Sequence, residues 1–374
     1  MAAGSPVTLR AAAEEAPRLL FVFAATTPLR YLSCVVSRFA GVDTREVTIG
    51  STTLPLRMTS TARQRGRGRE VLAKSAEMMA FYGNLVGEVP YPSLSLAVLE
   101  SQIPGGHAPG YVAIINQPLP TTPYLWRDDP ASFDVFPDFF LAHELAHQWW
   151  GQAVGWQNYH EQWLSEGFAQ YFAVLFAERN RSPEVFGAML RQLARWTLSE
   201  SDQGPVYLGY RLGHLRGEGR VFRALVYNKG AAVLHMLRRL LGDDAFFAGV
   251  RRFYREYRFR KASTESLRRA FEAEAGRSLE SFFRRWIYGQ DVPTVTVKWE
   301  MTGDGRTVRI DLQQVGDTEF EFPVTVARIY KDGSTETETV IVATTLTTLE
   351  RPLKAPLREV EVNGDKLTPV RIRK

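Results

Sequence analysis

The chain has six histidines, and two of them lie four residues apart in the segment HELAHQWW, at His143 and His147. On an α-helix this spacing puts both imidazoles on nearly the same face, where they can offer two nitrogens to one ion. Glu144 is about 100° round the helix from His143, so its carboxylate borders that face without having to bind. His-Glu-x-x-His is a known zinc signature for this reason, although a single histidine is more often only a satisfied polar residue on a helix.

A zinc site needs at least one more protein ligand if a single position is to stay open for chemistry. Glu166, in WLSEGFAQYF, is the candidate, and eighteen residues (Gln148 to Ser165) separate it from His147. The residues flanking it are large and mostly apolar: Trp163, Leu164, Phe168 and Tyr171. They favour a buried helix over a surface carboxylate, and a buried glutamate needs a partner.

Two neutral imidazoles and one carboxylate would leave a zinc site with a net charge of +1, which favours an acidic zinc-bound water. Hydrolysis requires such a water. Glu144 would then be the general base, accepting the water's proton and passing it to the leaving amine.

The segment His143–Phe172 resembles the zinc core of the aminopeptidase N family, whose pattern is His-Glu-x-x-His, eighteen residues, then Glu, with tryptophans and a glycine between. The agreement covers these positions: Trp149, Gly151, Trp163, Leu164, Glu166, Gly167 and Phe168. One departure is Ser165, where the family usually has Asn. The resemblance implies a zinc peptidase that acts on peptides and binds one Zn²⁺ through His143, His147 and Glu166.

The resemblance continues in VYNKGAAVLHML, Val226–Leu237. The family has a tyrosine ahead of Lys-Gly, which donates a hydrogen bond to the oxyanion of the tetrahedral intermediate, and Tyr227 matches it. A neutral phenol aimed at developing negative charge suits that role. Thermolysin relatives use a downstream histidine instead, so His214 and His235 are alternatives that rank below Tyr227.

The family's Gly-x-Met-Glu-Asn segment, whose glutamate holds the free amino terminus of the substrate, is altered in PGGHAPGYVAII. Gly105 and Gly106 are retained, whereas the Met, Glu and Asn positions align with His107, Ala108 and Pro109. Alanine cannot pair with an ammonium group. We therefore expect Gly105, Gly106 and His107 to bind substrate, with altered recognition of its amino terminus. His107 is either a substitute recognition group or merely an exposed histidine in a Gly/Pro loop.

Two other functions compete with an aminopeptidase-like one. The first is a zinc endopeptidase that acts on internal sites or on peptides with blocked amino termini. The second is a non-catalytic interaction scaffold built on a retired peptidase fold. A scaffold has no need to keep His143, Glu144, His147, Glu166 and Tyr227 together, so their joint presence disfavours it.

The expected fold class is multidomain α+β. Residues 1–54 read as strands, in segments that include LLFVFAATT and LRYLSCVVSRF, and the resemblance makes them the remnant of a larger N-terminal β-domain that is otherwise missing. Residues 55–291 are expected to form the mainly helical, thermolysin-like catalytic domain. From residue 292 to 374 apolar residues alternate with period two, as in TVTVKWEM, which predicts a small all-β sandwich.

Several local elements follow from the residue pattern. A helix is predicted over Arg69–Val86, after a solvated basic loop at RQRGRGR, and strands are predicted in LSLAVLES and YVAIIN. Later helices are expected to end or begin at Gly151, Ser182-Pro183, Gly242 and Gly276, because glycine closes helices and proline suits a first turn.

The composition is that of an ordinary globular protein of 374 residues, with a net charge of +5. One cysteine, Cys34, excludes an internal disulfide framework. A nucleic-acid partner is disfavoured, because no aromatic residues interleave with the basic run Arg63–Arg69. No apolar run is long enough for a membrane span. The segment LLFVFAA is short and follows Glu14 and Glu15 instead of the basic n-region of a signal peptide, so a cytoplasmic location is favoured unless the chain is a fragment.

Overall fold

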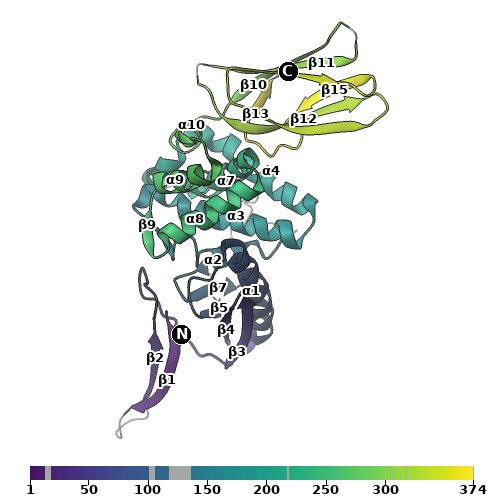
Figure 1. The fold of residues 1–374 in the computed structure, drawn as a ribbon. Coiled ribbons are helices and arrows are strands. Elements are labelled where there is room, and N and C mark those ends of the chain that lie inside the picture. Colours follow the sequence, from purple (N-terminus) through teal and green to yellow (C-terminus); the bar gives the residue numbers. More distant parts are fainter. Residues whose placement is uncertain are drawn as a thin grey trace. The chain divides into compact units, whose positions relative to one another are not determined.

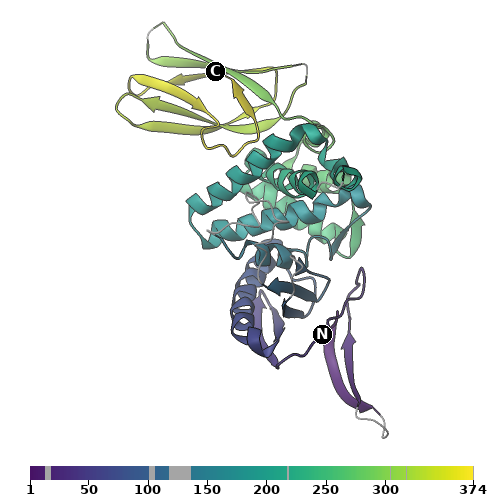
Figure 2. The same cartoon turned by 180° about the vertical axis from the view of Figure 1, so that it is seen from behind.

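The computed structural model describes residues 1–12, 18–100, 106–117, 136–216, 219–303, 305–316 and 318–373. Figures 1 and 2 show its ribbon from two sides. The chain divides into two compact units, each built from two stretches of sequence. The first contains Met1–Ser182 and Val250–Leu267, and the second contains Pro183–Gly249 and Arg268–Lys374. The helical region is therefore shared between the units, while the C-terminal strands belong wholly to the second.

The first unit contains a five-stranded sheet with the order β3-β4-β5-β7-β6. Its strands are β3 (Val42–Ile49), β4 (Thr52–Ser60), β5 (Leu94–Glu100), β6 (Gly106–His107) and β7 (Val112–Gln117). β3 and β4 form an antiparallel hairpin, β4, β5 and β7 are parallel, and β6 is antiparallel to β7. The strands predicted in LSLAVLES and YVAIIN are confirmed as β5 and β7. The domain boundary predicted at residue 54 falls inside β4.

Helix α1 (Arg65–Val86) connects β4 to β5 and buries its apolar residues. It begins four residues before the predicted start at Arg69, so most of the basic run is helical and the prediction of a loop there is wrong. The local packing accounts for the longer helix. Gly68 is buried in its second turn, where a Cβ would lie 3.1 Å from Ser60 Oγ, and this close approach seats the start of α1 on β4.

The first residues of the chain form a separate antiparallel pair, β1 (Ser5–Ala12) and β2 (Arg18–Ala24). The strand predicted in LRYLSCVVSRF, Leu29–Phe39, is wrong, because this segment contains only an isolated bridge. Its apolar residues Leu32 and Val36 are 83% and 93% exposed. A preference for strand conformation expresses packing on a sheet surface, and here these side chains pack on none.

The helices that carry the candidate ligands belong to the first unit. They are α2 (Phe139–Ala146) and α3 (Trp163–Asn180), and the chain between them contains strand β8 (Val154–Trp156) and a 3₁₀ turn, η3 (Tyr159–Glu161). β8 pairs in parallel with β9 (Arg260–Ala262), a contact that the sequence does not predict because three residues show no alternation. Gly151, the predicted helix end, has a φ of +105° and follows the turns that continue from α2.

The second unit is mainly helical before residue 290. The helices that lie wholly within this unit are α4 (Pro183–Glu200), α5 (Gly209–Arg216), α6 (Gly219–Phe222), the π-helical η6 (Arg223–Lys229), α7 (Gly230–Leu241) and α10 (Glu280–Trp286). Two short 3₁₀ turns, η4 (Ser201–Gln203) and η5 (Val206–Leu208), follow α4. The division between units falls within α8 (Asp243–Tyr257) and α9 (Thr264–Ala275). Pro183, Gly242 and Gly276 bound these helices as predicted. No helix in the described ranges is long and apolar enough to span a membrane.

The C-terminal strands form two sheets, with the orders β14-β11-β10-β16 and β13-β12-β15. Their bounds are β10 (Thr294–Met301), β11 (Thr307–Gln314), β12 (Phe322–Tyr330), β13 (Thr335–Val342), β14 (Leu346–Pro352), β15 (Leu357–Val362) and β16 (Arg371–Arg373). Alternate residues of β11 are buried, as the period of two predicts. A β-domain following a helical region is therefore confirmed.

Candidate metal centre

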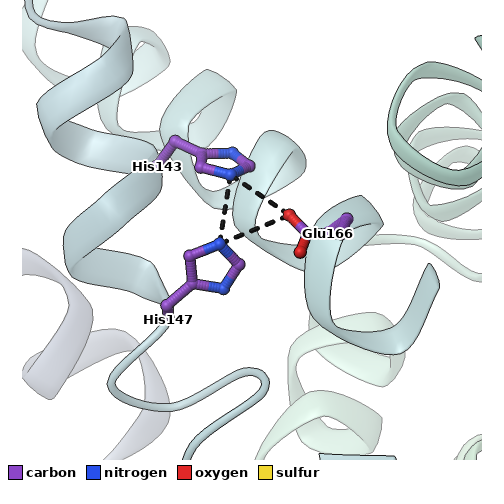
Figure 3. Close-up of side chains that lie close together, drawn as sticks. All are labelled: His143, His147 and Glu166. Atoms are coloured by element: carbon purple, nitrogen blue, oxygen red, sulfur yellow. Dashed lines mark hydrogen bonds and ion pairs between the residues drawn. The ribbon is translucent and has the colours of Figure 1, made fainter. Parts of the chain in front are cut away.

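Three side chains of the first unit bring one ligand atom each to a common point (Figure 3). α2 ends at Ala146, but His147 keeps right-handed helical angles (φ −61°, ψ −19°), so its spacing from His143 still places both rings on one side. The two Nε2 atoms are 3.1 Å apart. Glu166, in the first turn of α3, places Oε2 3.4 Å from Nε2 of His143 and 3.3 Å from Nε2 of His147.

These distances fit a small tetrahedral ion. An ion with bonds of about 2.0–2.1 Å to nitrogen and oxygen, as zinc has, separates its ligand atoms by about 3.3–3.4 Å along the edges of the tetrahedron. The three separations, 3.1, 3.3 and 3.4 Å, lie close to that value. Three ligands leave the fourth corner open. The group is therefore positioned to bind a metal ion while leaving one position for a water or a substrate.

Burial and mutual charge shift the pKa values of the ligands. Burial alone would lower the pKa of His147, but the nearby Glu166 carboxylate raises it to about 9. Burial would likewise raise the pKa of Glu166, but His147 and His143 hold it below its usual range. The side chain of Glu166 is only 12% exposed, which excludes the surface carboxylate considered as an alternative. Because only the neutral ring can coordinate, the raised pKa of His147 means that a metal ion competes with a proton for this ligand.

The hydrogen bond made by Nδ1 of His147 determines which nitrogen of its ring can bind the ion. Its Nδ1 lies 2.9 Å from the backbone oxygen of Trp150. A carbonyl oxygen only accepts, so Nδ1 carries the hydrogen and donates it, and the lone pair of the neutral ring is on Nε2. The ring therefore turns its coordinating nitrogen toward His143 and Glu166.

Glu144 is buried beside this group but contributes no ligand atom to it. Burial raises its pKa to about 7, Glu166 adds to the rise, and His147 opposes it. A carboxyl group with a pKa near neutrality is suited to general base chemistry. The backbone of Gly106 in β6 lies directly against it, because a Cβ on Gly106 would be 2.6 Å from Glu144 Cγ and 2.7 Å from Oε1. Of the two predicted glycines, Gly106 is thus at the site, and Gly105 lies outside the described residues.

His107 follows Gly106 in β6 and is exposed. Its ring stacks on Tyr31, with centroids 5.7 Å apart, and Tyr31 is itself 41% exposed. Burial and then the nearby His147 lower the pKa of His107. Ala108 is 5% exposed and, like Pro109, carries no charge, so neither brings a carboxylate to this part of the site.

Two residues at the site were not predicted from the sequence. One is Tyr31, whose contact with His107 joins distant parts of the chain and leaves no local signal. The other is Gln148, which follows the second histidine ligand and is 1% exposed. Its amide donates to the backbone oxygens of Pro109 and Val112 and accepts from Tyr111 N, at 3.0–3.1 Å. The sequence did contain one indication of a buried, hydrogen-bonded role for Gln148, because this polar residue directly precedes two tryptophans in HELAHQWW.

The structure places the predicted oxyanion donor, Tyr227, in the second unit. It lies in the π-helical segment η6, next to the ring of Phe222 (5.4 Å) and the guanidinium of Arg223 (5.0 Å). π-Helical turns occur frequently at functional sites. Of the alternatives, His214 stacks on a tyrosine ring, and His235 is 5% exposed with a pKa lowered to about 3 by burial and the neighbouring arginines. The role of Tyr227 stays a prediction.

Comparisons with known proteins bear on this site. Residues 139–286 match the family model described as Peptidase family M1 domain. Aminopeptidase M1-A of Oryza sativa subsp. japonica is 32% identical over 160 residues, which is 42% of this chain and 18% of that protein. Aminopeptidase N of Lactococcus lactis subsp. lactis is 30% identical over 164 residues, or 42% of this chain and 19% of that protein.

Among solved structures, Legionella pneumophila aminopeptidase A in complex with aspartic acid matches with a TM-score of 0.74 and 16% identity, over 100% of this chain and 43% of that one. This likeness is one of fold. The regions matched in the two curated relatives are about a fifth of their length. The histidine pair, Glu144, Glu166 and Tyr227 all fall inside the matched residues, whereas Gly106 and His107 lie outside them.

Proposed function

We propose that this chain, which belongs to the M1 peptidase family through residues 139–286, hydrolyses peptide bonds with one zinc ion and is aminopeptidase-like. The observation that carries the proposal is the convergence of His143, His147 and Glu166 at the spacing of a tetrahedral zinc site, inside the matched region. The buried carboxyl group of Glu144, which interacts electrostatically with His147 and Glu166, supports hydrolysis in particular.

The residues have separate tasks in this proposal. Zinc, when bound by the three ligands, would supply Lewis acidity to the scissile carbonyl and to the attacking water. Glu144 accepts a proton from that water and passes it to the leaving amine. Tyr227 donates a hydrogen bond to the oxygen on which negative charge develops, a role that rests on the family resemblance. Gly106 allows the backbone of β6 to lie against the general base.

The domain organisation belongs to the same proposal. Residues 55–291 form a thermolysin-like catalytic domain, and residues 292–374 form a β-sandwich. The likeness in fold to a solved aminopeptidase over 100% of this chain supports this organisation.

One observation favours a second candidate function. An aminopeptidase that holds the substrate's ammonium group needs a carboxylate near the position of Ala108, and this residue and Pro109 offer none. Exposed rings, Tyr31 and His107, lie nearby instead. An endopeptidase, or a peptidase for blocked amino termini, would not need that carboxylate. The names of the relatives keep the aminopeptidase-like function first.

Removing the metal tests the proposal directly. Purified protein should contain about one zinc per chain, and a chelator should abolish most of its hydrolysis of a mixture of free and amino-blocked peptides. Adding back Zn²⁺ should restore the activity, because the ligands are held by two packed helices. Zinc content by mass spectrometry and initial rates before and after dialysis are the measurements. Hydrolysis that is unaffected when the zinc is gone would exclude the proposed function.

A second experiment separates the two candidates at the amino end. Removing one partner of a buried charge pair typically costs about 2–5 kcal/mol. Without a carboxylate for the ammonium group, this chain should prefer free over acetylated peptides by less than about tenfold in kcat/KM, well below the ratio that such a pair would give. Matched pairs of peptides that differ only in the acetyl group provide the comparison. A strong preference for the free amine would show that another acidic residue supplies the charge, and would favour the plain aminopeptidase.

A further inference from the structure

Two consecutive residues in the first turn of α3 reach the two nitrogens of one imidazole. Glu166 Oε2 lies 3.3 Å from Nε2 of His147, the nitrogen that faces the metal position. Ser165 Oγ lies 3.2 Å from Nδ1, on the other side of the same ring. Rotation of the ring about its Cβ–Cγ bond would break both contacts. α3 therefore holds this ring from both sides.

The Ser165 hydroxyl also contacts the carbonyl that fixes the tautomer. It donates to the backbone oxygen of Trp150 at 3.2 Å, and that oxygen accepts from His147 Nδ1 at 2.9 Å. Since the hydroxyl hydrogen points to the carbonyl, a lone pair of Oγ is turned toward the Nδ1–H group. Both acceptors around Nδ1 thus favour the tautomer with a free lone pair on Nε2. Ser165 is 3% exposed, so water competes little for these bonds.

The chain next to this hydroxyl leaves room for it. Gly151 has a φ of +105°, and a Cβ at this position would collide with Ser165 Oγ. It would also lie 3.5 Å from His147 Nδ1. The turn after α2 therefore brings backbone without a side chain against the hydroxyl and the ring. The Ser165 hydroxyl therefore lies between the backbone of Gly151 and the ring of His147.

We infer that Ser165 is a positioning residue that fixes the orientation and tautomer of His147 from the helix that carries Glu166, and so strengthens metal binding without touching the ion. The inference rests on the proposed function in taking zinc as the ion. Hydrogen-bond partners of metal-bound histidines typically contribute 10–100-fold to metal affinity. The lower end is expected here, because the Trp150 carbonyl remains when the hydroxyl is removed.

The test uses the full chain and the metal alone. Ser165→Ala should raise the zinc dissociation constant about tenfold in competition with a chelator. Ser165→Thr keeps a hydroxyl and should bind zinc more tightly than Ser165→Ala. The matched control is Ser75→Ala. Ser75 is fully buried in α1, its hydroxyl has no hydrogen-bond partner among the described residues, and this change should leave the zinc dissociation constant as it is.

A second readout follows the geometry of the site. Co²⁺ in place of zinc gives visible absorption bands that depend on the arrangement of its ligands, and these should change in Ser165→Ala but not in Ser75→Ala. If wild-type protein binds one zinc and Ser165→Ala binds it equally well with the same Co²⁺ spectrum, the inference is overturned and the proposed function stands. An equal loss of affinity in Ser75→Ala would overturn it too. If the wild-type protein takes up no zinc, the proposed function itself fails.

Discussion

Replacing Glu144 with glutamine is expected to lower kcat by about 10²–10⁴-fold, the usual contribution of a general base, while the protein keeps its zinc. Glutamine has nearly the same shape but cannot accept the proton of the attacking water. Glu144 lies outside the group of three ligands, so the metal has no direct need of its charge. The measurements are kcat on a peptide that the wild-type protein cleaves and zinc content by mass spectrometry.

Two further variants make that result specific. Glu166→Ala should lose zinc together with activity, because it removes a ligand. Glu77→Gln makes the same chemical change as Glu144→Gln at an exposed position in α1, and it should alter neither zinc content nor kcat. A Glu144→Gln protein with the wild-type rate would contradict the assignment of the base. A Glu144→Gln protein without zinc would show that Glu144 acts through the metal site instead.

The metal group is predictable from the sequence because its spacing is local. His143 and His147 meet through the geometry of one helical turn, and this holds although α2 formally ends before the second of them. Predicting Glu166 as the third ligand required evidence beyond local spacing, because eighteen residues, which include a turn, a short strand and a 3₁₀ segment, separate it from His147. The large apolar residues around it predicted the buried helix correctly. The same periodic patterns predicted β5, β7 and the strands β10 and β11.

The remaining features depend on contacts between residues that are distant in sequence. The stacking of Tyr31 on His107 and the pairing of β8 with β9 have no periodic signal in either partner. The segment Leu29–Phe39 shows the reverse error, because residues that favour strands lie there without a sheet to pack on. The π-helical turn around Tyr227 was also missed, since one extra residue in a helix hardly changes an apolar pattern.

Gly106→Ala is the second change for which a large effect is expected, although it adds a single methyl group and no charge. The new Cβ would lie 2.6 Å from Glu144 Cγ and 2.7 Å from Oε1, so either the carboxylate or β6 must move. A displacement of about 1 Å in a reacting group can cost about 10²-fold in rate, and we expect a loss of kcat of that size with zinc retained. Gly66→Ala in α1 is the matched control, because no atom lies within 4 Å of a Cβ there, and kcat should not change.

Combining Gly106→Ala with Glu144→Gln shows whether the glycine acts through the base. If the added methyl group only displaces the carboxylate, a protein that already lacks the base has little left to lose, and the double variant should be about as slow as Glu144→Gln alone. If Gly106 instead matters because the backbone of β6 binds the substrate, the two losses should multiply and KM should rise in both backgrounds. The four proteins, compared by kcat and KM on one peptide, distinguish these outcomes. Multiplying losses would return Gly106 to the substrate-binding role that the resemblance implied.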